Sequence, residues 1–195
     1  MMRIITGRAR GVRLATLAGE NTRPTAERTK EAIFSMIQFD IQGASVLDLF
    51  AGSGQMGLEA LSRGAEHALL CDHSKDAVEI IRKNALKTRL APMCDILCTD
   101  FETLLRAQRK KNQFDLVFLD PPYALGAIPK ALRMLVDYGL LSDGARIVCE
   151  SASEDDVFAG DAALESRFDL LRRTCYGVAF VTLLQYKAGD GEVAG

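Results

Sequence analysis

The sequence contains no apolar run long enough to cross a membrane. Its hydrophobic segments are short, and the longer ones carry an internal Asp or Arg, whereas a membrane-spanning helix needs about 20 apolar residues. The first eight residues, MMRIITGR, are too polar for the apolar region of a signal peptide. These absences argue against a membrane partner and predict a soluble, cytoplasmic protein.

Patterns for disulfides and metal ions are also lacking. The five cysteines are an odd number without a C-x-x-C pair, and there are only two histidines. No cluster of these residues has the spacing of a metal site. We therefore expect reduced thiols and no metal. The residues concerned are Cys71, Cys94, Cys98, Cys149, Cys175, His67 and His73.

Charge is unevenly distributed along the 195 residues. The net charge is −2, yet residues 1–30 hold seven basic and two acidic side chains, a balance of +5, so the rest of the chain carries −7. A basic segment on an acidic body suggests contact with phosphates, although a solvated surface would look the same. The predicted RNA-binding residues are Arg3, Arg8, Arg10, Arg13 and Arg23.

Apolar periodicity predicts an α/β protein. Two short strands, 3–6 and 12–17, precede a helix that begins near Pro24. Strands and helices then alternate. The expected strands are 45–50, 68–71, 95–99, 115–119 and 145–150, and the helices between them are 55–63, 75–87, 102–109 and 128–138. Two β-rich runs, 169–174 and 179–186, end the pattern.

This alternation is typical of a doubly wound, Rossmann-like fold. We expect a mostly parallel seven-stranded sheet, with an antiparallel strand from the C-terminal hairpin. The predicted organisation has three parts: an N-terminal β-hairpin and helix (1–40), a ligand-binding domain (41–188) and a flexible tail (189–195).

The first main strand ends in Asp48-Leu49-Phe50-Ala51-Gly52-Ser53-Gly54, followed by Gly57. Glycines at a strand-to-helix turn allow a ligand to approach the backbone closely. The spacing also matches the dinucleotide motif G-x-G-x-x-G, which is weak evidence alone because a tight structural turn would show it too. Asp48 suits a ligand with an ammonium group better than a pyrophosphate.

Two further acids end the next two strands. Asp72 lies 20 residues after Gly52, where a carboxylate can accept hydrogen bonds from ribose hydroxyls. Asp100 is followed by Phe101, a pair that suits an adenine ring. Each acid alone could be a helix N-cap, but three acids at successive strand ends favour a nucleoside ligand.

The run Asp120-Pro121-Pro122-Tyr123 follows another apolar strand. The prolines fix the backbone, and Pro121 donates no hydrogen bond, so the corner is rich in acceptors. Acceptors that take both hydrogens of an exocyclic base amine direct its lone pair at an electrophile. Tyr123 offers a stacking surface for an unstacked base. A purely structural Pro-Pro turn is the alternative.

These motifs resemble those of class I S-adenosylmethionine-dependent methyltransferases. The whole chain, in order, resembles the RsmD family of bacterial enzymes that methylate N2 of a guanine in 16S ribosomal RNA. The segments that carry this resemblance are 2–7 with Gly11, Thr22-Arg23-Pro24-Thr25, 28–34 and 47–54. The resemblance implies a guanine-N2 methyltransferase whose partner is 16S ribosomal RNA, free or within the assembling small subunit.

The resemblance also implies roles for individual residues. The loop of Asp48, Phe50, Ala51, Gly52, Ser53 and Gly54 would surround the methionine half of S-adenosylmethionine. Asp72 and His73 would lie at the ribose, and Asp100 and Phe101 at the adenine. Arg23 and Thr25 would lie at the mouth of the pocket. Asp120, Pro121, Pro122 and Tyr123 would hold the guanine, with direct displacement and no cysteine beside them to form a covalent intermediate.

The sequence departs from the family pattern at two points. The ribose acid is commonly Glu in such families, and here it is Asp72. The acidic stretch 154–156 is unexpected on an RNA-contacting surface, which leaves the predicted RNA contact to the N-terminal segment.

Three other functions fit parts of the pattern. An adenine-N6 methyltransferase acting on DNA or another RNA would use the same Asp-Pro-Pro-Tyr run, but 195 residues show no segment for DNA recognition. A nicotinamide-dependent oxidoreductase would leave Asp48 and that run unexplained. A non-catalytic RNA-binding module would not need these acids and glycines.

Overall fold

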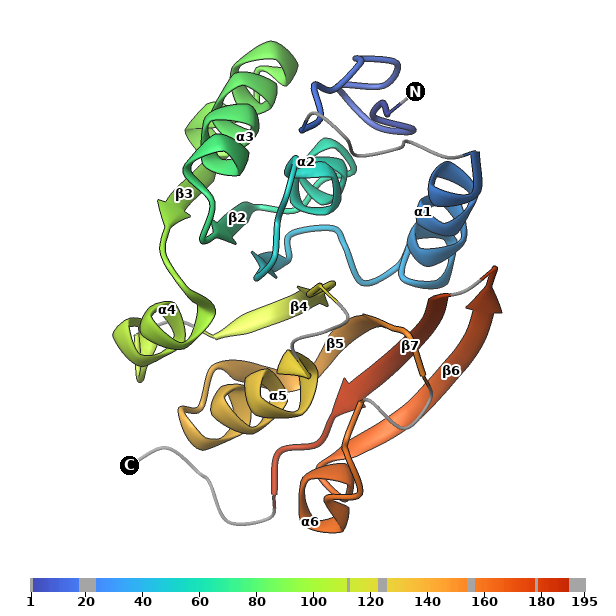
Figure 1. The fold of residues 1–195 in the computed structure, drawn as a ribbon, viewed down its shortest axis with the longest axis vertical. Helices are drawn as coiled ribbons and strands as arrows, with labels where there is room; N and C mark the ends of the chain where they lie inside the picture. The colour runs from blue at the N-terminus through green and yellow to red at the C-terminus, as the bar shows by residue number, and fades with distance from the viewer. Residues whose placement is uncertain are drawn as a thin grey trace.

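A computed structural model describes residues 2–17, 24–111, 113–122, 126–153, 157–177 and 179–189. Its elements, in chain order, are α1 (Pro24–Met36), β1 (Ser45–Asp48), α2 (Gln55–Ser62), β2 (His67–Asp72), α3 (Lys75–Thr88), the 3-10 turn η1 (Ala91–Met93), β3 (Cys94–Cys98), α4 (Phe101–Gln108), β4 (Phe114–Leu119), α5 (Ala127–Asp137), β5 (Leu141–Ser151), α6 (Ala162–Glu165), β6 (Phe168–Tyr176) and β7 (Ala179–Tyr186) (Figure 1).

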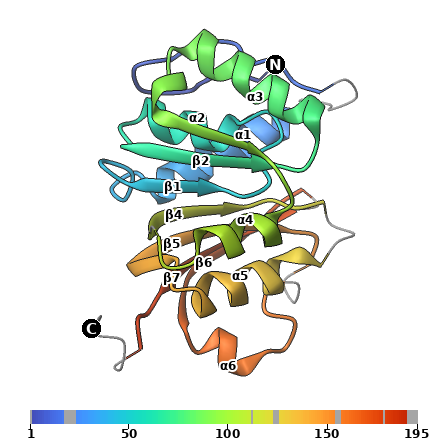
Figure 2. The ribbon, with the colours of Figure 1, turned by 90° about the vertical axis from the view of Figure 1, so that its left-hand side faces the viewer.

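The seven strands form one sheet in the order β3-β2-β1-β4-β5-β7-β6. Neighbouring strands from β3 to β5 are parallel. β7 lies between β5 and β6 and is antiparallel to both. The predicted mixed sheet with an antiparallel C-terminal strand is therefore confirmed. Figure 2 shows β2, β1, β4 and β5 one above another, with α4 and α5 in front of the lower strands.

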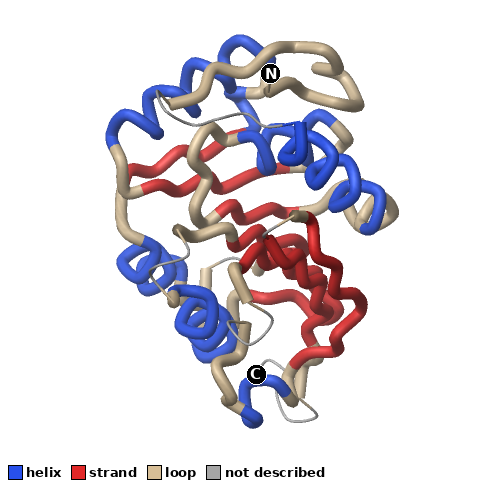
Figure 3. The backbone as a smooth tube through the Cα atoms, turned by 45° about the vertical axis from the view of Figure 1, so that its right-hand side comes forward, coloured by secondary structure: helices blue, strands red, loops and turns tan. Residues whose placement is uncertain are grey.

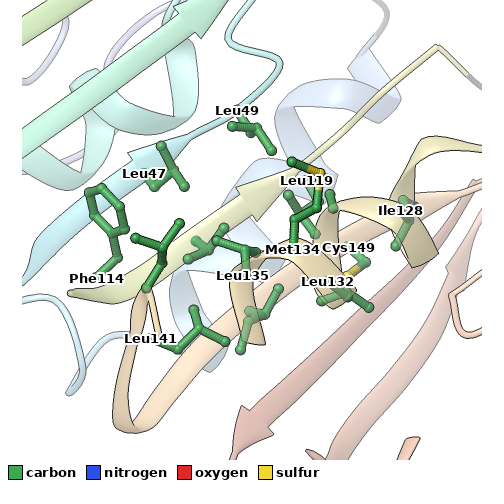
Figure 4. Packing of buried hydrophobic residues seen from close by; sticks show 14 of the residues in the cluster. Leu47, Leu49, Phe114, Leu119, Ile128, Leu132, Met134, Leu135, Leu141 and Cys149 are labelled. Carbon is green, nitrogen blue, oxygen red and sulfur yellow. The ribbon is translucent and has the colours of Figure 1, made fainter. Parts of the chain in front are cut away.

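Helices cover both faces of the sheet because neighbouring strand residues point to opposite faces (Figure 3). On one face Leu47 and Val117 pack with residues of α4 and α5, such as Leu105 and Leu135, and Figure 4 shows the centre of this cluster. On the other face residues of α1, α2 and α3 pack against Val46, Leu116, Phe118 and their neighbours. Such two-sided burial explains why these strands are continuously apolar.

The N-terminal arm, residues 2–17, differs from the two strands expected there. It folds back on itself through one antiparallel bridge, Arg3 to Arg13, and a few backbone hydrogen bonds such as Ile4 N–H to the Val12 carbonyl at 3.0 Å. Much of its backbone bonding is instead to helix α2. Ile4, Leu14 and residues of α1 share one hydrophobic cluster with α2 and α3, so the described arm and α1 both pack against these helices.

Some of the expected features lie outside the described residues. These are Arg23, Tyr123, the acidic stretch 154–156 and the tail after Gly189; the side chain of Thr25 is likewise not described. None of the helices in the described part of the chain combines the length and apolar character that crossing a bilayer requires. All five cysteines are unpaired.

Candidate functional site

The predicted site residues converge at one edge of the sheet. β1 lies between β2 and β4 with Asp48 opposite Leu70 and Phe118, and all three strands run in the same direction. Their carboxyl ends therefore lie side by side. Asp48, Asp72 and Asp120 are at or just beyond these ends, where ligands of open α/β sheets bind.

Asp48 is a buried carboxylate at the start of helix α2. Its side chain is 3 % exposed, and its Oδ2 accepts a hydrogen bond from the Gly57 N–H at 3.0 Å. The N-cap residue of α2 is Gly54, which has no side chain to cap the helix, so Asp48 does this from the preceding strand. Burial raises the pKa of Asp48 to about 7, which leaves it half ionised near neutral pH.

The turn between Asp48 and α2 is tight and glycine-dependent. Gly52 and Gly54 have positive φ angles of 54° and 77°, which L-residues with a Cβ rarely adopt. The Gly54 N–H donates to the Ala51 carbonyl at 2.6 Å. A Cβ on Gly57 would lie 2.1 Å from Leu70 Cδ2. The third glycine of the motif therefore allows the helix to pack against β2.

Asp72 connects this turn to helix α3. Its Oδ2 accepts from the Gly52 N–H at 2.9 Å, and its Oδ1 accepts from the Ser74 N–H at 2.8 Å. His73 is exposed, with Nδ1 3.6 Å from Asp72 Oδ1. A carboxylate offers about four lone-pair positions, so these two bonds leave acceptor capacity for a ligand hydroxyl.

Asp100 caps helix α4. Its Oδ1 accepts from the Thr103 N–H at 2.8 Å, and this bond lowers the pKa of the carboxyl below its usual value. The capping role considered from the sequence is thus present at this acid. Beside it, the rings of Phe50 and Phe101 lie 5.4 Å apart at 52° to one another. The two rings bring apolar surface from the turn after β1 and from the start of α4 to the same edge.

The Asp-Pro-Pro corner follows β4 directly. Asp120 and Pro122 are exposed, whereas Pro121 is buried. The structure corrects one expectation here, because Cys149 of β5 is in register with Leu119 and so lies close to the corner. It is fully buried, and burial raises the pKa of its thiol to about 12. Cys149 is therefore a packing residue and a poor nucleophile.

The arginines of the arm fall into two groups. Arg3 pairs with Glu27 at 2.7 Å, and the Arg8 guanidinium donates to the Leu61 carbonyl at the end of α2, at 3.0 and 3.3 Å. Arg10 and Arg13 are exposed, and neither has a hydrogen bond or ion pair from its side chain to another described residue. Among the described arginines of the arm, Arg10 and Arg13 are therefore the ones best placed for a partner.

Ser53 faces the arm. Its hydroxyl donates to Met2 Sδ at 3.0 Å, and its carbonyl accepts from Asn84 Nδ2 at 2.9 Å. The residue is 3 % exposed. Its side chain therefore contributes to holding the arm against the turn, beyond the cofactor-loop role expected from its position in the motif.

Two buried polar residues that anchor the arm were missed from the sequence. Fully buried Glu59 on α2 accepts from the Ile5 and Thr6 N–H groups at 2.7 and 3.0 Å, and its carboxylate lies between Lys30 and Arg63. Fully buried Asn84 on α3 bonds both backbone groups of Ala15. The sequence feature that could have revealed them is a polar residue on the otherwise apolar face of α2 and of α3.

The residues present fit a cationic nucleoside ligand better than a pyrophosphate. The N-terminus of α2, which would attract a phosphate, is already occupied by the Asp48 carboxylate at Gly57 N–H. A second anion there would be repelled, whereas an ammonium group would be attracted. In the described part of the chain, no group of three or more His, Cys, Asp or Glu side chains is arranged to hold a metal ion.

Comparison with known proteins assigns the family. A family model described as "Conserved hypothetical protein 95" matches residues 2–185. The chain belongs to this family. Its relatives include ribosomal RNA small subunit methyltransferase D of Escherichia coli K12, 34% identical over 191 residues that cover 98% of this chain and 92% of that protein. The resemblance to the RsmD family is thereby confirmed.

Two further similarities extend over the same length. YlbH of Bacillus subtilis is 35% identical over 185 residues, covering 93% of this chain and 97% of that protein. The solved structure of the Escherichia coli protein yhhF has a TM-score of 0.84 and 33% identity, covering 96% of this chain and 98% of that one. The architecture of this family member is the class I methyltransferase fold.

Proposed function

We propose that the protein transfers a methyl group from S-adenosylmethionine to the exocyclic N2 amine of a guanine in 16S ribosomal RNA, within the assembling small subunit. The observation that carries this proposal is the meeting of Asp48, Asp72 and the Asp120 corner at the ends of three adjacent parallel strands. Membership of a family that includes small-subunit rRNA methyltransferases supports the RNA substrate.

The chain offers a partner for each part of the cofactor. Asp48 and the loop from Phe50 to Gly54 would hold the methionine half, with the carboxylate facing its ammonium group. Asp72 would accept the ribose hydroxyls. The Phe50 and Phe101 rings, with Asp100, would receive the adenine. Bound there, S-adenosylmethionine supplies a methyl group on a positively charged sulfur, which makes that carbon electrophilic.

Asp120 would act on the guanine. An exocyclic amine is a weak nucleophile because its lone pair is delocalised into the ring. A carboxylate that accepts one of its hydrogens orients the lone pair and stabilises the positive charge that develops on nitrogen. Pro121 is buried and holds the backbone at the end of β4, so the carboxylate is held in place before the base arrives. In this proposal Tyr123 stacks on the base.

The decisive variant is Asp120→Ala, with Asp137→Ala as its matched control. Asp137 is an exposed acid at the end of α5. In single-turnover methylation by folded, cofactor-saturated enzyme, Asp120→Ala should be about 100- to 1000-fold slower, a loss typical of removing one preorganised catalytic group. Asp137→Ala should match the wild type. Equal rates for both variants would remove Asp120 from the mechanism.

The product identifies the reaction. Small subunits from a strain that lacks this protein would be incubated with the enzyme and S-adenosylmethionine, and their nucleosides separated by mass spectrometry. N2-methylguanosine is expected. Detection of N6-methyladenosine instead would mean that the substrate base is adenine and not guanine. Free 16S rRNA, assayed in parallel, tests whether assembly is needed.

A further inference from the structure

The second half of helix α3 presents an exposed row of basic side chains. Lys83 and Lys87 are four residues apart and so are neighbours on the surface of the helix. Arg82 directly precedes Lys83, and Arg89 follows at the C-cap. All four are exposed, and residues 80–90 contain no Asp or Glu. We refer to Arg82, Lys83, Lys87 and Arg89 as the α3 basic row.

The row is not neutralised within the protein. None of its four side chains has an ion pair or hydrogen bond to another described residue, whereas Lys130 on α5 lies 2.6 Å from Glu102. Lys83 and Lys87 repel one another at a spacing that weakens a helix. The helix dipole favours cations only in the last turn. Glu79 stands three and four residues before Arg82 and Lys83, a spacing that favours a helix, but no ion pair from Glu79 to either side chain is present among the described residues.

The row continues into the exposed cations of the arm. Asn84, on the same helix, holds the N–H and carbonyl of Ala15 at 2.8 and 2.9 Å, so the end of the arm lies against α3. Arg13 is only two residues away, about 7 Å of extended chain. The arm crosses beside α2 and α3 in both Figure 1 and Figure 2. Arg13 thus lies within reach of α3, and Arg10 lies farther along the arm beside the end of α2, where the Ala9 N–H donates to the Ser62 hydroxyl.

From this geometry we infer that the α3 basic row and the exposed arm arginines form one binding surface for the phosphate backbone of RNA. The inference rests on the proposed function, because an RNA substrate is the polyanion that this enzyme would meet. α3 begins beside Asp72 and its 14 residues extend about 21 Å from the ligand edge. The surface therefore binds RNA at a distance from the base being methylated. It determines the affinity for RNA and the position of the RNA on the enzyme, and it does not affect the rate of methyl transfer.

The test compares two double variants of the full chain that remove equal charge. Lys83→Ala with Lys87→Ala removes two cations of the row. Lys110→Asn with Lys111→Ala removes two exposed cations beyond α4; asparagine is used because Lys110 has a φ of 58°, which asparagine tolerates. RNA affinity is measured by filter binding with 16S rRNA over a series of salt concentrations.

The row variant should bind RNA about tenfold more weakly. Its plot of log K against log salt should also become less steep, by about 1.4 to 1.8 in the magnitude of the slope, or about 0.7 to 0.9 for each lost phosphate contact. Its KM for RNA should rise while kcat and S-adenosylhomocysteine affinity stay unchanged. Arg10→Ala with Arg13→Ala should behave in the same way. The control variant should match the wild type.

The two proposals can fail separately. If the wild type methylates rRNA but the row variant keeps the wild-type salt slope, the surface is overturned and the function stands. If the row variant loses RNA affinity but the wild type methylates no guanine, the surface stands and the function is overturned. Equal losses in the row and control variants would indicate a general charge effect and would overturn the surface.

Discussion

Asn84 and Ser53, 31 residues apart in sequence, are joined by a hydrogen bond of 2.9 Å from the Asn84 side chain to the Ser53 carbonyl. The same side chain bonds both backbone groups of Ala15. One buried amide thus connects the N-terminal arm to the turn that is proposed to hold the cofactor. A substitution that removes this amide should therefore weaken the attachment of the arm and the packing of the turn.

Asn84→Ala should release the arm. The substitution leaves the buried Ser53 carbonyl and the partly buried N–H and carbonyl of Ala15 without this partner, at about 1–3 kcal/mol for the buried carbonyl and less for the partly exposed groups. Local opening of the arm should then be at least about tenfold more frequent. Trypsin, which cleaves after arginine, should cut after Arg10 and Arg13 correspondingly faster.

Thr88→Val provides the control for this variant. Thr88 is buried on the same helix, but its hydroxyl bonds only carbonyls of that helix. Trypsin should cut the arm of the Thr88→Val protein at the wild-type rate. Equal cleavage of the Asn84→Ala and Thr88→Val proteins would mean that the arm is held by other contacts, such as those to Glu59.

Ligand affinity should depend on pH through Asp48. Because the pKa of this carboxyl is about 7, it is mostly neutral at pH 6 and mostly ionised at pH 8, and only the ionised form attracts an ammonium group. S-adenosylhomocysteine should therefore bind about tenfold more tightly at pH 8 than at pH 6. Calorimetry with Asp48→Asn, or with adenosine as a ligand lacking the ammonium, should show no such dependence.

The same carboxyl should affect stability in the opposite sense. Its pKa is 3.8 in the unfolded chain and about 7 in the folded one, so between these values the folded protein binds the extra proton. The free energy of unfolding of the ligand-free protein should fall as pH rises through this window, by at most about 1.4 kcal/mol per pH unit. Urea unfolding of Asp48→Asn should lack this part of the slope.

Asp72→Asn should weaken binding of the nucleoside without unfolding the protein. Asparagine keeps one acceptor oxygen for the Gly52 or Ser74 N–H but loses the charge that strengthens bonds to ribose hydroxyls. Affinity for S-adenosylhomocysteine should fall by about 1–3 kcal/mol. Asp76→Asn, an exposed acid in the first turn of the same helix, should bind like the wild type. Unchanged calorimetric affinity in Asp72→Asn would disprove the ribose role.

Much of the candidate site could be read from the sequence because it depends on local pattern and on one rule of topology. Parallel strands place their carboxyl ends at the same edge, so acids such as Asp48 and Asp72, which close apolar runs, had to come together. The glycines that allow positive φ angles at Gly52 and Gly54 are likewise visible as residues. The strand order decided which of these acids are neighbours, because β1 lies between β2 and β4 and so has Asp72 on one side and Asp120 on the other.

Only the tertiary structure decided how the arm is used. Glu59 bonds Ile5 and Thr6 across more than 50 residues, and Asn84 bonds Ala15 across 69. Such partners depend on which helix faces pack together, and the spacing of apolar residues in the sequence does not reveal this. For the same reason all arm arginines looked equivalent in sequence. In the folded protein Arg8 donates to a carbonyl of α2, whereas Arg13 stays exposed. The difference arises because the surface against which the backbone lies determines which partners a side chain can reach.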